Sequence, residues 1–383
     1  MMVQNVETGQ RELLGPGAAP FYSPSGHLVY QSAPTTHDLW ALPFSLDTLK
    51  ATGEAFPISE NSRGPTVAAD GTLVYLDSSD SGEQQLVWRG RRGERIVEIG
   101  QPQAAISEPA LSPDAKLVAV SASEGPSPGD IWIHDISRSL KTRLSFAPED
   151  ESLPVWSPDG KQIVYSHRHS GQSDILVKPA DGSGEAQPLV STEAREDICD
   201  WSADGTRILY EVRDPKTGSD LWHLERKPDG SGYESHPLLQ TPFDEQAARF
   251  SPDGRFVAYC SNESGEVGVY VRPFPQGGAR WQVSSGEGRQ PRWRRDGQEI
   301  FYVEGDTMIA VSVSTRPGFS VGKAARWFQN PNLPFPAGFA IRYDVSPDGE
   351  RFVLREPVEE GGIQPAIRVV LNWFEEFRGR DQD

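Results

Sequence analysis

Two cysteines and the lack of a long apolar run are the first notable features of this 383-residue chain. Cys199 and Cys260 lie in different segments, so neither a disulfide framework nor a zinc site can be argued from them. No stretch of about 18 apolar residues, the length needed to span a membrane, is present. The N-terminus has no basic region followed by an apolar core, so we expect no signal peptide.

Positive charge is also scarce. Lysine and arginine number 37 against 55 aspartates and glutamates, which gives a formal net charge of −18 at pH 7. This excess of negative charge repels phosphate backbones, so we expect no nucleic-acid partner, and we also expect no direct membrane contact. The chain lacks P-loop, HExxH, dinucleotide-binding and EF-hand motifs, and no cofactor is expected.

Turn-forming residues, by contrast, are abundant and recur at a regular spacing. The chain has 37 glycines and 32 prolines, and the stretch LPVWSPDGKQIVYS at residues 153–166 is one of eight similar stretches. The turn cores are SPSG (23–26), AADG (68–71), SPDA (112–115), SPDG (157–160), SADG (202–205), SPDG (251–254), RRDG (294–297) and SPDG (346–349). They recur every 43 to 52 residues, which suits a four-stranded propeller blade.

Local sequence explains each turn as the corner of a β-hairpin. A large or β-branched residue precedes every turn, and a strand-forming run such as KQIVY follows it. Proline sets φ at the second turn position, and glycine supplies a positive φ at the fourth. We therefore assign the turn aspartates, including Asp159, to hairpin structure, and we expect Trp156 to pack between blades. Ala115 replaces glycine in the third turn, where we expect strain or a changed turn.

These repeats predict an all-β fold, a single β-propeller over residues 1–383 with four-stranded antiparallel blades. Eight blades are preferred, with seven as the alternative. The repeats lie near 16–60, 61–103, 104–149, 150–193, 194–243, 244–287, 288–331 and 332–377, followed by a tail at 378–383. Because the eighth repeat ends before its fourth strand, we expect residues 1–15 to close the ring through a strand at 10–14.

Loop variation indicates where a site would lie. In a blade whose strands run A to D, the A–B turns here are short and uniform, whereas the B–C loops are long and varied. We therefore expect binding on the B–C face, at the channel mouth. The polar residues expected there are Asp200, Arg249, Arg292 and Asp344, with Glu108 and Arg342 close by in sequence. They form either a ligand pocket or salt bridges between blades.

Two histidines form a second candidate site. His167 and His169 are two residues apart, so both can face one way on a strand and begin a metal site. A third ligand is needed, and Asp214 is the nearest candidate. The alternative is that both histidines are solvated loop residues. No residue is assigned a catalytic role.

Several longer motifs resemble a known family. WSPDGKQIVYSHRHSGQSDILVKPADGSG resembles the TolB-type propeller repeat. QPRWRRDGQEIFY, YDVSPDGERFVL and the C-terminal VVLNWFEEF resemble the C-terminal propeller region of acidobacterial-type bacterial serine/threonine kinases. The resemblance covers almost the whole chain, and it implies a sensor or interaction role. The chain has no kinase catalytic motif, so kinase activity is not carried over.

The function expected from these features is non-catalytic recognition of a protein partner or a small ligand by a monomer. The competing hypotheses are a propeller hydrolase or lyase with its polar site at the channel mouth, and a structural spacer. The location depends on the parent protein: outside the cytoplasm if the chain belongs to a membrane kinase, and cytoplasmic otherwise.

Overall fold

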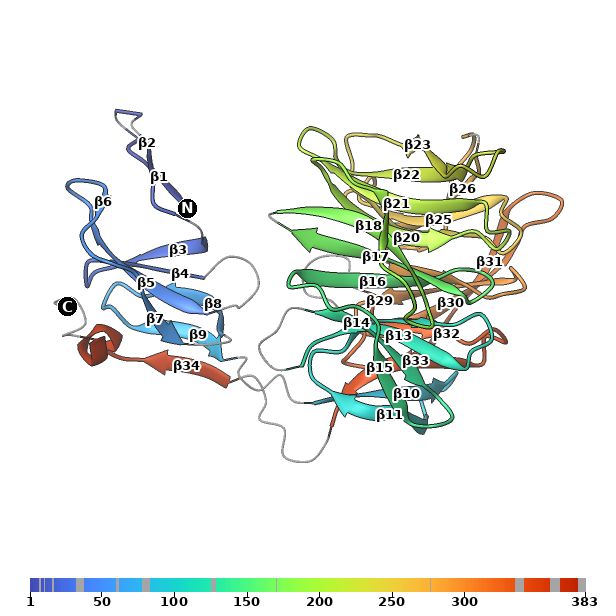
Figure 1. The fold of residues 1–383 in the computed structure, drawn as a ribbon, viewed down its shortest axis with the longest axis horizontal. Coiled ribbons are helices and arrows are strands. Elements are labelled where there is room, and N and C mark those ends of the chain that lie inside the picture. The colour runs from blue at the N-terminus through green and yellow to red at the C-terminus, as the bar shows by residue number, and fades with distance from the viewer. Residues whose placement is uncertain are drawn as a thin grey trace. The chain divides into compact units, whose positions relative to one another are not determined.

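The computed structural model describes the chain except residues 7, 10, 16, 32–37, 60–61, 78–82, 125–128, 170, 276, 335–340, 359–365 and 378–383. The fold is nearly all β, as predicted, and divides into two compact units (Figure 1). Unit 1 comprises Met1–Gly82 with Glu359–Asp383, and unit 2 comprises Glu83–Val358. This division corrects the prediction of a single domain over residues 1–383. The turn period runs through both units, but each unit has its own sheets.

Six blades, each of four antiparallel strands, make up the described part of unit 2, and a parallel pairing of Ser173 with Arg195 joins two of them into one eight-stranded sheet. Five are consecutive in sequence: β12 (Ser107–Leu111), β13 (Leu117–Ala122), β14 (Asp130–Asp135) and β15 (Leu140–Arg143); β16 (Asp150–Trp156), β17 (Gln162–His169), β18 (Gln172–Pro179) and β19 (Gln187–Val190); β20 (Arg195–Trp201), β21 (Arg207–Asp214), β22 (Gly218–Arg226) and β23 (Tyr233–Leu239); β24 (Glu245–Phe250), β25 (Phe256–Ser261), β26 (Gly268–Pro273) and β27 (Trp281–Gln282); β28 (Arg289–Trp293), β29 (Glu299–Glu304), β30 (Thr307–Ser314) and β31 (Ser320–Gln329). The sixth blade combines β32 (Tyr343–Val345) and β33 (Arg351–Pro357) with β10 (Gln84–Gly90) and β11 (Arg95–Gln103).

Hydrogen bonds across every blade interface close these six blades into a ring. At five interfaces a side-chain oxygen accepts a backbone N–H of another blade: Glu108 from Leu153, Ser166 from Ile198, Glu211 from Ala247, Gln290 from Arg342 and Asp344 from Leu111. At the remaining interface the indole N–H of Trp293 donates to the carbonyl of Arg249. Because the contact of Asp344 with Leu111 joins the sixth blade to the first of the consecutive blades, the ring is closed.

The strand that completes the sixth blade comes from the beginning of unit 2. β10 pairs with β33 along its length, from Gln84 opposite Pro357 to Gly90 opposite Arg351. The predicted N-terminal closing strand does not take this position, because β2 (Arg11–Leu13) pairs with β1 (Met2–Gln4). The structure therefore corrects the prediction for residues 1–15, of which Gln10 lies outside the described residues.

Unit 1 accounts for the remaining repeats. Besides the β1–β2 pair, its sheets consist of β3 (Ala18–Ser23), β4 (His27–Gln31), β5 (Leu39–Ser45), β6 (Lys50–Ala51) and β7 (Phe56–Ser59), and of β8 (Ser62–Val67), β9 (Leu73–Asp77) and β34 (Ala366–Val370); η1 (Trp373–Phe377) follows. Val29, Ala41, Phe56, Leu73 and Trp373 form the core between them. The eight repeats thus correspond to two sheets here and six blades in unit 2. The propeller class is confirmed, but the pairing differs from one eight-bladed ring.

The hairpin turns have the structure that the sequence predicts. The hydroxyl of Ser157 donates to Asp159 at 2.6 Å and accepts the N–H of Gln162 at 2.9 Å, and Gly160 has φ of 71°. Ala115 adopts the same turn with φ of 54°, so the expected strain is present without a change of turn. Trp156 is buried against Ile131 of the preceding blade, which confirms its predicted position between blades.

A β-bulge recurs in the inner strands. The register shifts after Ser107, Ser152, Gln246 and Arg289, and the bulges include residues with φ above 50°: Glu108, Leu153, Ala247 and Gln290. A bulge leaves a backbone N–H without a ladder partner. Acidic side chains of the preceding blades accept two of these, from Leu153 and Ala247, at 2.6 Å each. The bulges therefore contribute to the contacts between blades.

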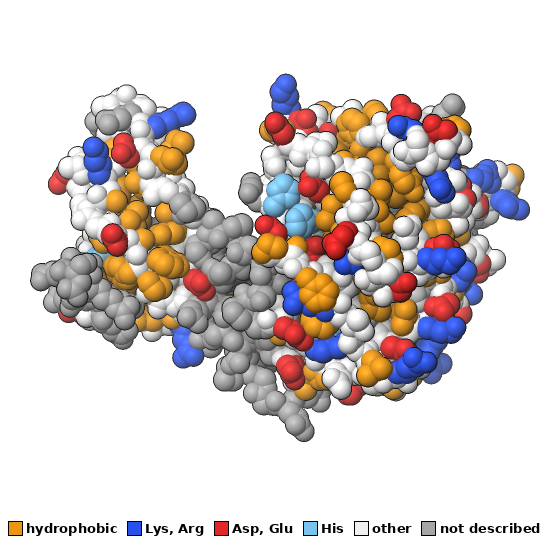
Figure 2. All heavy atoms as spheres, viewed as in Figure 1, with side chains coloured by type: hydrophobic (Ala, Val, Ile, Leu, Met, Phe, Trp, Pro, Cys, Tyr) orange, Lys and Arg blue, Asp and Glu red, His pale blue; other side chains and the backbone are white. Residues whose placement is uncertain are grey.

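Within the described residues, no helix has the length and apolarity needed to cross a membrane. Acidic and basic side chains are interspersed over the visible face of unit 2 (Figure 2).

Candidate functional site

A cavity of about 360 Å³ occupies the centre of unit 2, and all six inner strands line it. Its rim carries the second residue of each A–B turn: Pro113, Pro158, Ala203, Pro252, Arg295 and Pro347. Four prolines and one alanine make this rim mostly apolar and conformationally restricted. Arg295 donates from Nη1 to the carbonyl of Pro113 at 3.0 Å, so its side chain extends along the rim to another blade.

The rim lies on the face opposite to the one expected from loop variation. The sequence predicted a site among the B–C loops, whereas the A–B turns frame this cavity. Uniform turns looked purely structural because their sequence explains their conformation completely. Parts of five B–C loops, at 32–37, 78–82, 125–128, 170 and 359–365, lie outside the described residues.

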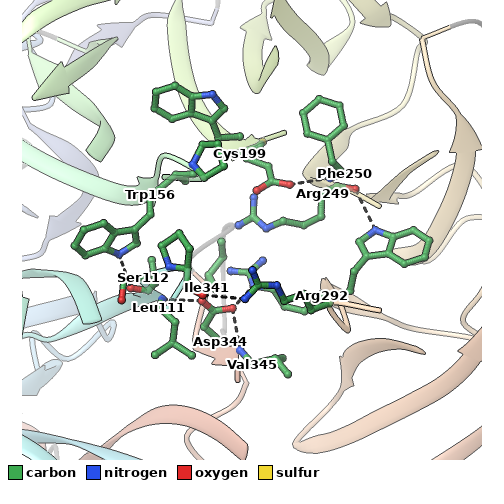
Figure 3. Close-up of a pocket in the computed structure, with 18 of the residues that line it drawn as sticks. Leu111, Ser112, Trp156, Cys199, Arg249, Phe250, Arg292, Ile341, Asp344 and Val345 are labelled. Carbon is green, nitrogen blue, oxygen red and sulfur yellow. Dashed lines mark hydrogen bonds and ion pairs between the residues drawn. The ribbon is translucent and has the colours of Figure 1, made fainter. Parts of the chain in front are cut away.

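Four of the predicted polar residues lie together on the wall of this cavity. Asp200, Arg249, Arg292 and Asp344 come from β20, β24, β28 and β32 and occupy equivalent positions, one residue before the large or β-branched residue of each inner strand. Figure 3 shows both guanidinium groups pointing into the cavity and toward one another. The equivalent positions on β12 and β16 are Ala110 and Val155, so four of the six equivalent wall positions are polar and two adjacent ones are apolar.

Both aspartates hold neighbouring blades together. Asp200 accepts the N–H of Phe250 at 2.8 Å, and Asp344 accepts the N–H of Leu111 at 2.8 Å (Figure 3). Asp344 also accepts from Arg292 Nε at 3.2 Å. Burial raises the pKa of Asp200, and the nearby Arg249 charge opposes that increase. The contact of Asp344 with Arg292 is a salt bridge between blades, whereas Asp200 contacts a backbone N–H and forms no ion pair within 4.0 Å among the described residues.

The two arginines differ in their partners. Arg292 forms an ion pair with Asp344, whereas Arg249 forms none within 4.0 Å among the described residues. The hydrogen bond found for the Arg249 side chain runs from Nη1 to the carbonyl of Ala248, at 3.0 Å. Burial and then the positive charge of Arg292 lower the pKa of Arg249 to about 10, so it still carries a proton at neutral pH.

The other two residues of the predicted group have different surroundings. Glu108 lines the inner part of the cavity, but its carboxylate accepts the bulge N–H of Leu153 at 2.6 Å, and burial raises its pKa. Arg342 is buried outside the cavity lining, and its backbone N–H donates to Gln290 at 2.7 Å. Among the predicted residues, Arg342 is therefore the one that the structure separates from the group.

The histidine pair lies on β17 of the same unit. The ring centroids of His167 and His169 are 5.6 Å apart, and their nearest acids are Glu151 at 3.6 Å and Asp174 at 3.1 Å, respectively. Asp214 accepts the N–H of Lys216 at 2.7 Å in its own loop. No cluster of three or more possible metal ligands occurs within the described residues.

Sequence reasoning missed the acceptors Glu211 and Gln290 and the turn prolines of the rim. Glu211 and Gln290 lie one blade away from the N–H groups that they cap, so no local spacing marks them. The prolines did recur in the sequence, but their restriction of φ was enough to explain their place in the turns. The structure shows that they also line the rim of one cavity.

TolB-like proteins are among the solved structures that this chain resembles. A structure described as a candidate TolB from Agrobacterium tumefaciens matches with a TM-score of 0.54 and 15% identity, over 72% of this chain and 99% of that one. TolB from Acinetobacter baumannii matches with a TM-score of 0.46 and 17% identity, over 79% and 82% of the two chains. The match to the Agrobacterium tumefaciens structure shows that the chain has a TolB-like β-propeller fold.

Sequence relatives are distant. An uncharacterized protein of Agrobacterium fabrum is 25% identical over 62% of this chain and 83% of its own length. An uncharacterized peptidase of Bacillus subtilis is 23% identical over 41% of this chain but 30% of its own length. TolB of Alcanivorax borkumensis is 25% identical over 26% of this chain and 23% of its own length. No family model matches.

Proposed function

We propose that unit 2 is a non-catalytic recognition propeller that binds a small ligand, or a side chain of a protein partner, in its central cavity. The observation that carries this proposal is the convergence of Arg249 and Arg292 on a cavity of about 360 Å³ with an apolar rim. A concave, mostly apolar site with a few convergent polar groups is the usual form of a ligand pocket.

The carboxylates of the cavity favour binding over catalysis. Asp200, Asp344 and Glu108 each accept a backbone N–H of another blade, so each has a structural role. A general acid or base must be free to exchange its proton with a substrate. The match to the Bacillus subtilis peptidase spans under a third of that protein, so its named activity is not transferred.

The finer proposal is that this recognition serves a bacterial serine/threonine kinase as its sensor region. It rests on the resemblance of motifs such as QPRWRRDGQEIFY and VVLNWFEEF, and it implies a location outside the cytoplasm. The TolB-like fold supports an interaction role without identifying a partner.

A thermal-shift screen of the full chain with metabolites and short peptides tests the binding proposal. Ala203→Trp is the informative variant, because Ala203 is the smallest rim residue and a large side chain there should obstruct entry. Ligands that bind in the cavity should raise the Tm of the wild type and lose most of that effect in Ala203→Trp. A matched control is Ala324→Trp on the exposed β31, outside the cavity lining.

The proposal requires at least one compound or peptide with this pattern. A screen in which every binder stabilises Ala203→Trp as strongly as the wild type would place recognition elsewhere on the molecule. Turnover of a binder by the wild type would contradict the non-catalytic assignment.

A further inference from the structure

The two arginines of the cavity present more positive charge than the surrounding acids can neutralise by direct contact. Arg249 and Arg292 are 7% and 8% exposed, and their guanidinium groups face each other across the channel (Figure 3). Two like charges at this depth are unfavourable unless a counter-charge lies close by. Asp344 supplies one for Arg292 through a contact of 3.2 Å.

Arg249 has no such contact within the described residues, although an acid lies nearby. Asp200 accepts the N–H of Phe250 at 2.8 Å, which holds its carboxylate toward the backbone of β24. The charge of Asp200 favours the protonated form of Arg249, but the two side chains form no ion pair within 4.0 Å. The guanidinium of Arg249 therefore keeps donors directed into the cavity, opposite those of Arg292.

We propose that Arg249 and Arg292 bind a carboxylate of the ligand between them, so that the recognised compound is an organic acid or a peptide C-terminus with an apolar body. This inference rests on the proposed function of the cavity. A guanidinium presents its N–H groups in a planar fork, which matches a carboxylate in a two-point contact.

The remaining walls define the rest of the ligand. Asp200 and Asp344 line the same cavity and offset part of the attraction from the two arginines. A dianion such as phosphate loses more hydration on burial than a single carboxylate does, because the cost of desolvation grows faster with charge than the attraction. Toward the rim, Pro113, Pro158 and Pro252 provide apolar contact for the body of the ligand. The volume of about 360 Å³ suits a small aromatic acid or one or two terminal residues of a peptide.

Calorimetric titration of the full chain tests this proposal with four probes. They are 3-phenylpropanoate, its amide, an acetylated tripeptide ending in Leu-Phe with a free C-terminus, and the same tripeptide as the C-terminal amide. Acids should bind at least tenfold more tightly than their amides, and inorganic phosphate should not compete. Binding by the propanoate alone would identify a small acid as the ligand, and tighter binding by the free peptide would identify a C-terminus.

Variants locate the contact. Arg249→Met should weaken binding of the acids at least tenfold, and Arg249→Lys should weaken it less, because a charge remains but the planar fork is lost. Arg326→Met is the matched control, since this exposed arginine pairs with Glu304 on the outer part of another sheet. The Arg326→Met protein should bind the acids as tightly as the wild type. The comparison of acid with amide uses the wild type, so the test does not depend on the folding of any variant.

Equal affinity for acids and amides, no binding of either acid, or equal weakening by Arg249→Met and Arg326→Met would overturn the proposal. If the compound screen instead gives neutral binders that Ala203→Trp blocks, the cavity is a recognition site and the carboxylate assignment fails. The two proposals can therefore fail separately.

Discussion

At the scale of single residues, buried acids of this propeller serve as backbone acceptors between blades. Glu211 is 7% exposed; it accepts the N–H of Ala247 at 2.6 Å and a weak contact from the Cys199 thiol at 3.4 Å. Burial raises the pKa of Glu211 to about 7 despite these donors and the Arg249 charge. The folded state therefore retains a proton that the unfolded chain releases near its ordinary pKa of 4.5.

This difference predicts a pH-dependent effect of Glu211→Gln. Between about pH 4.5 and 7 the folded state binds more protons at this site, so the contribution of Glu211 to stability is full below pH 4.5 and is lost as the pH rises through 7. The amide of glutamine does not titrate. The stability of Glu211→Gln relative to the wild type should therefore improve across this window, by up to about 3 kcal/mol.

Urea unfolding of both proteins at several pH values measures this difference. The difference matters more than either profile, because buried His134 and His223 have pKa values lowered to about 4 and produce the opposite slope over part of the range. A constant difference between pH 4.5 and 8 would contradict the prediction.

At the scale of elements, the third A–B hairpin turn has alanine, Ala115, where most of the other turns have glycine, and it keeps the same conformation. Ala115 has φ of 54°, where the equivalent Gly160 and Gly254 have 71° and 69°. Its N–H still donates to the carbonyl of Ser112, at 2.8 Å. Surrounding strands thus impose the left-handed conformation on alanine, at a cost that glycine avoids.

Ala115→Gly should therefore stabilise the protein by up to about 1 kcal/mol, because relief of the left-handed strain exceeds the added entropy of the unfolded chain. Gly254→Ala is the reciprocal change, and a Cβ there would meet no atom within 4 Å, so it isolates the backbone effect. It should destabilise by a similar amount. Denaturant midpoints measure both, and a destabilised Ala115→Gly would show that φ is not what limits this turn.

At the scale of the whole molecule, the ring of unit 2 depends on segments far apart in sequence. β10 and β33 pair through Val87 and Leu354, both fully buried, and their side chains belong to the core of the last two blades. Without β10, the edge of β33 and part of this core would be exposed to solvent.

Residues 83–358 produced alone should therefore unfold in one cooperative thermal transition, whereas residues 104–358, which lack β10 and β11, should not. We expect the shorter fragment to be insoluble or to melt at least about 10 °C lower, because several kcal/mol of apolar burial are lost. Calorimetry of both fragments measures this. Equal melting temperatures would show that the ring does not require this closure.

Much of the local structure could be predicted from the sequence. The period of the turns, the strand after each turn and the position of Trp156 depend on residues close together in the chain, and the structure agrees with them. Four polar residues could also be assigned to equivalent positions in different blades, because a repeat of known period aligns them, and these four residues line one cavity.

The repeated hairpin and the propeller blades follow from the amino-acid sequence alone, because turn chemistry and strand patterning act within about ten residues. The three-dimensional packing shows which blades share a ring, that the A–B turns frame the cavity, and that Arg249 forms no ion pair within 4.0 Å among the described residues. These features depend on contacts between residues of different repeats. Because the repeats resemble one another in sequence, their pattern does not show which repeats pack together.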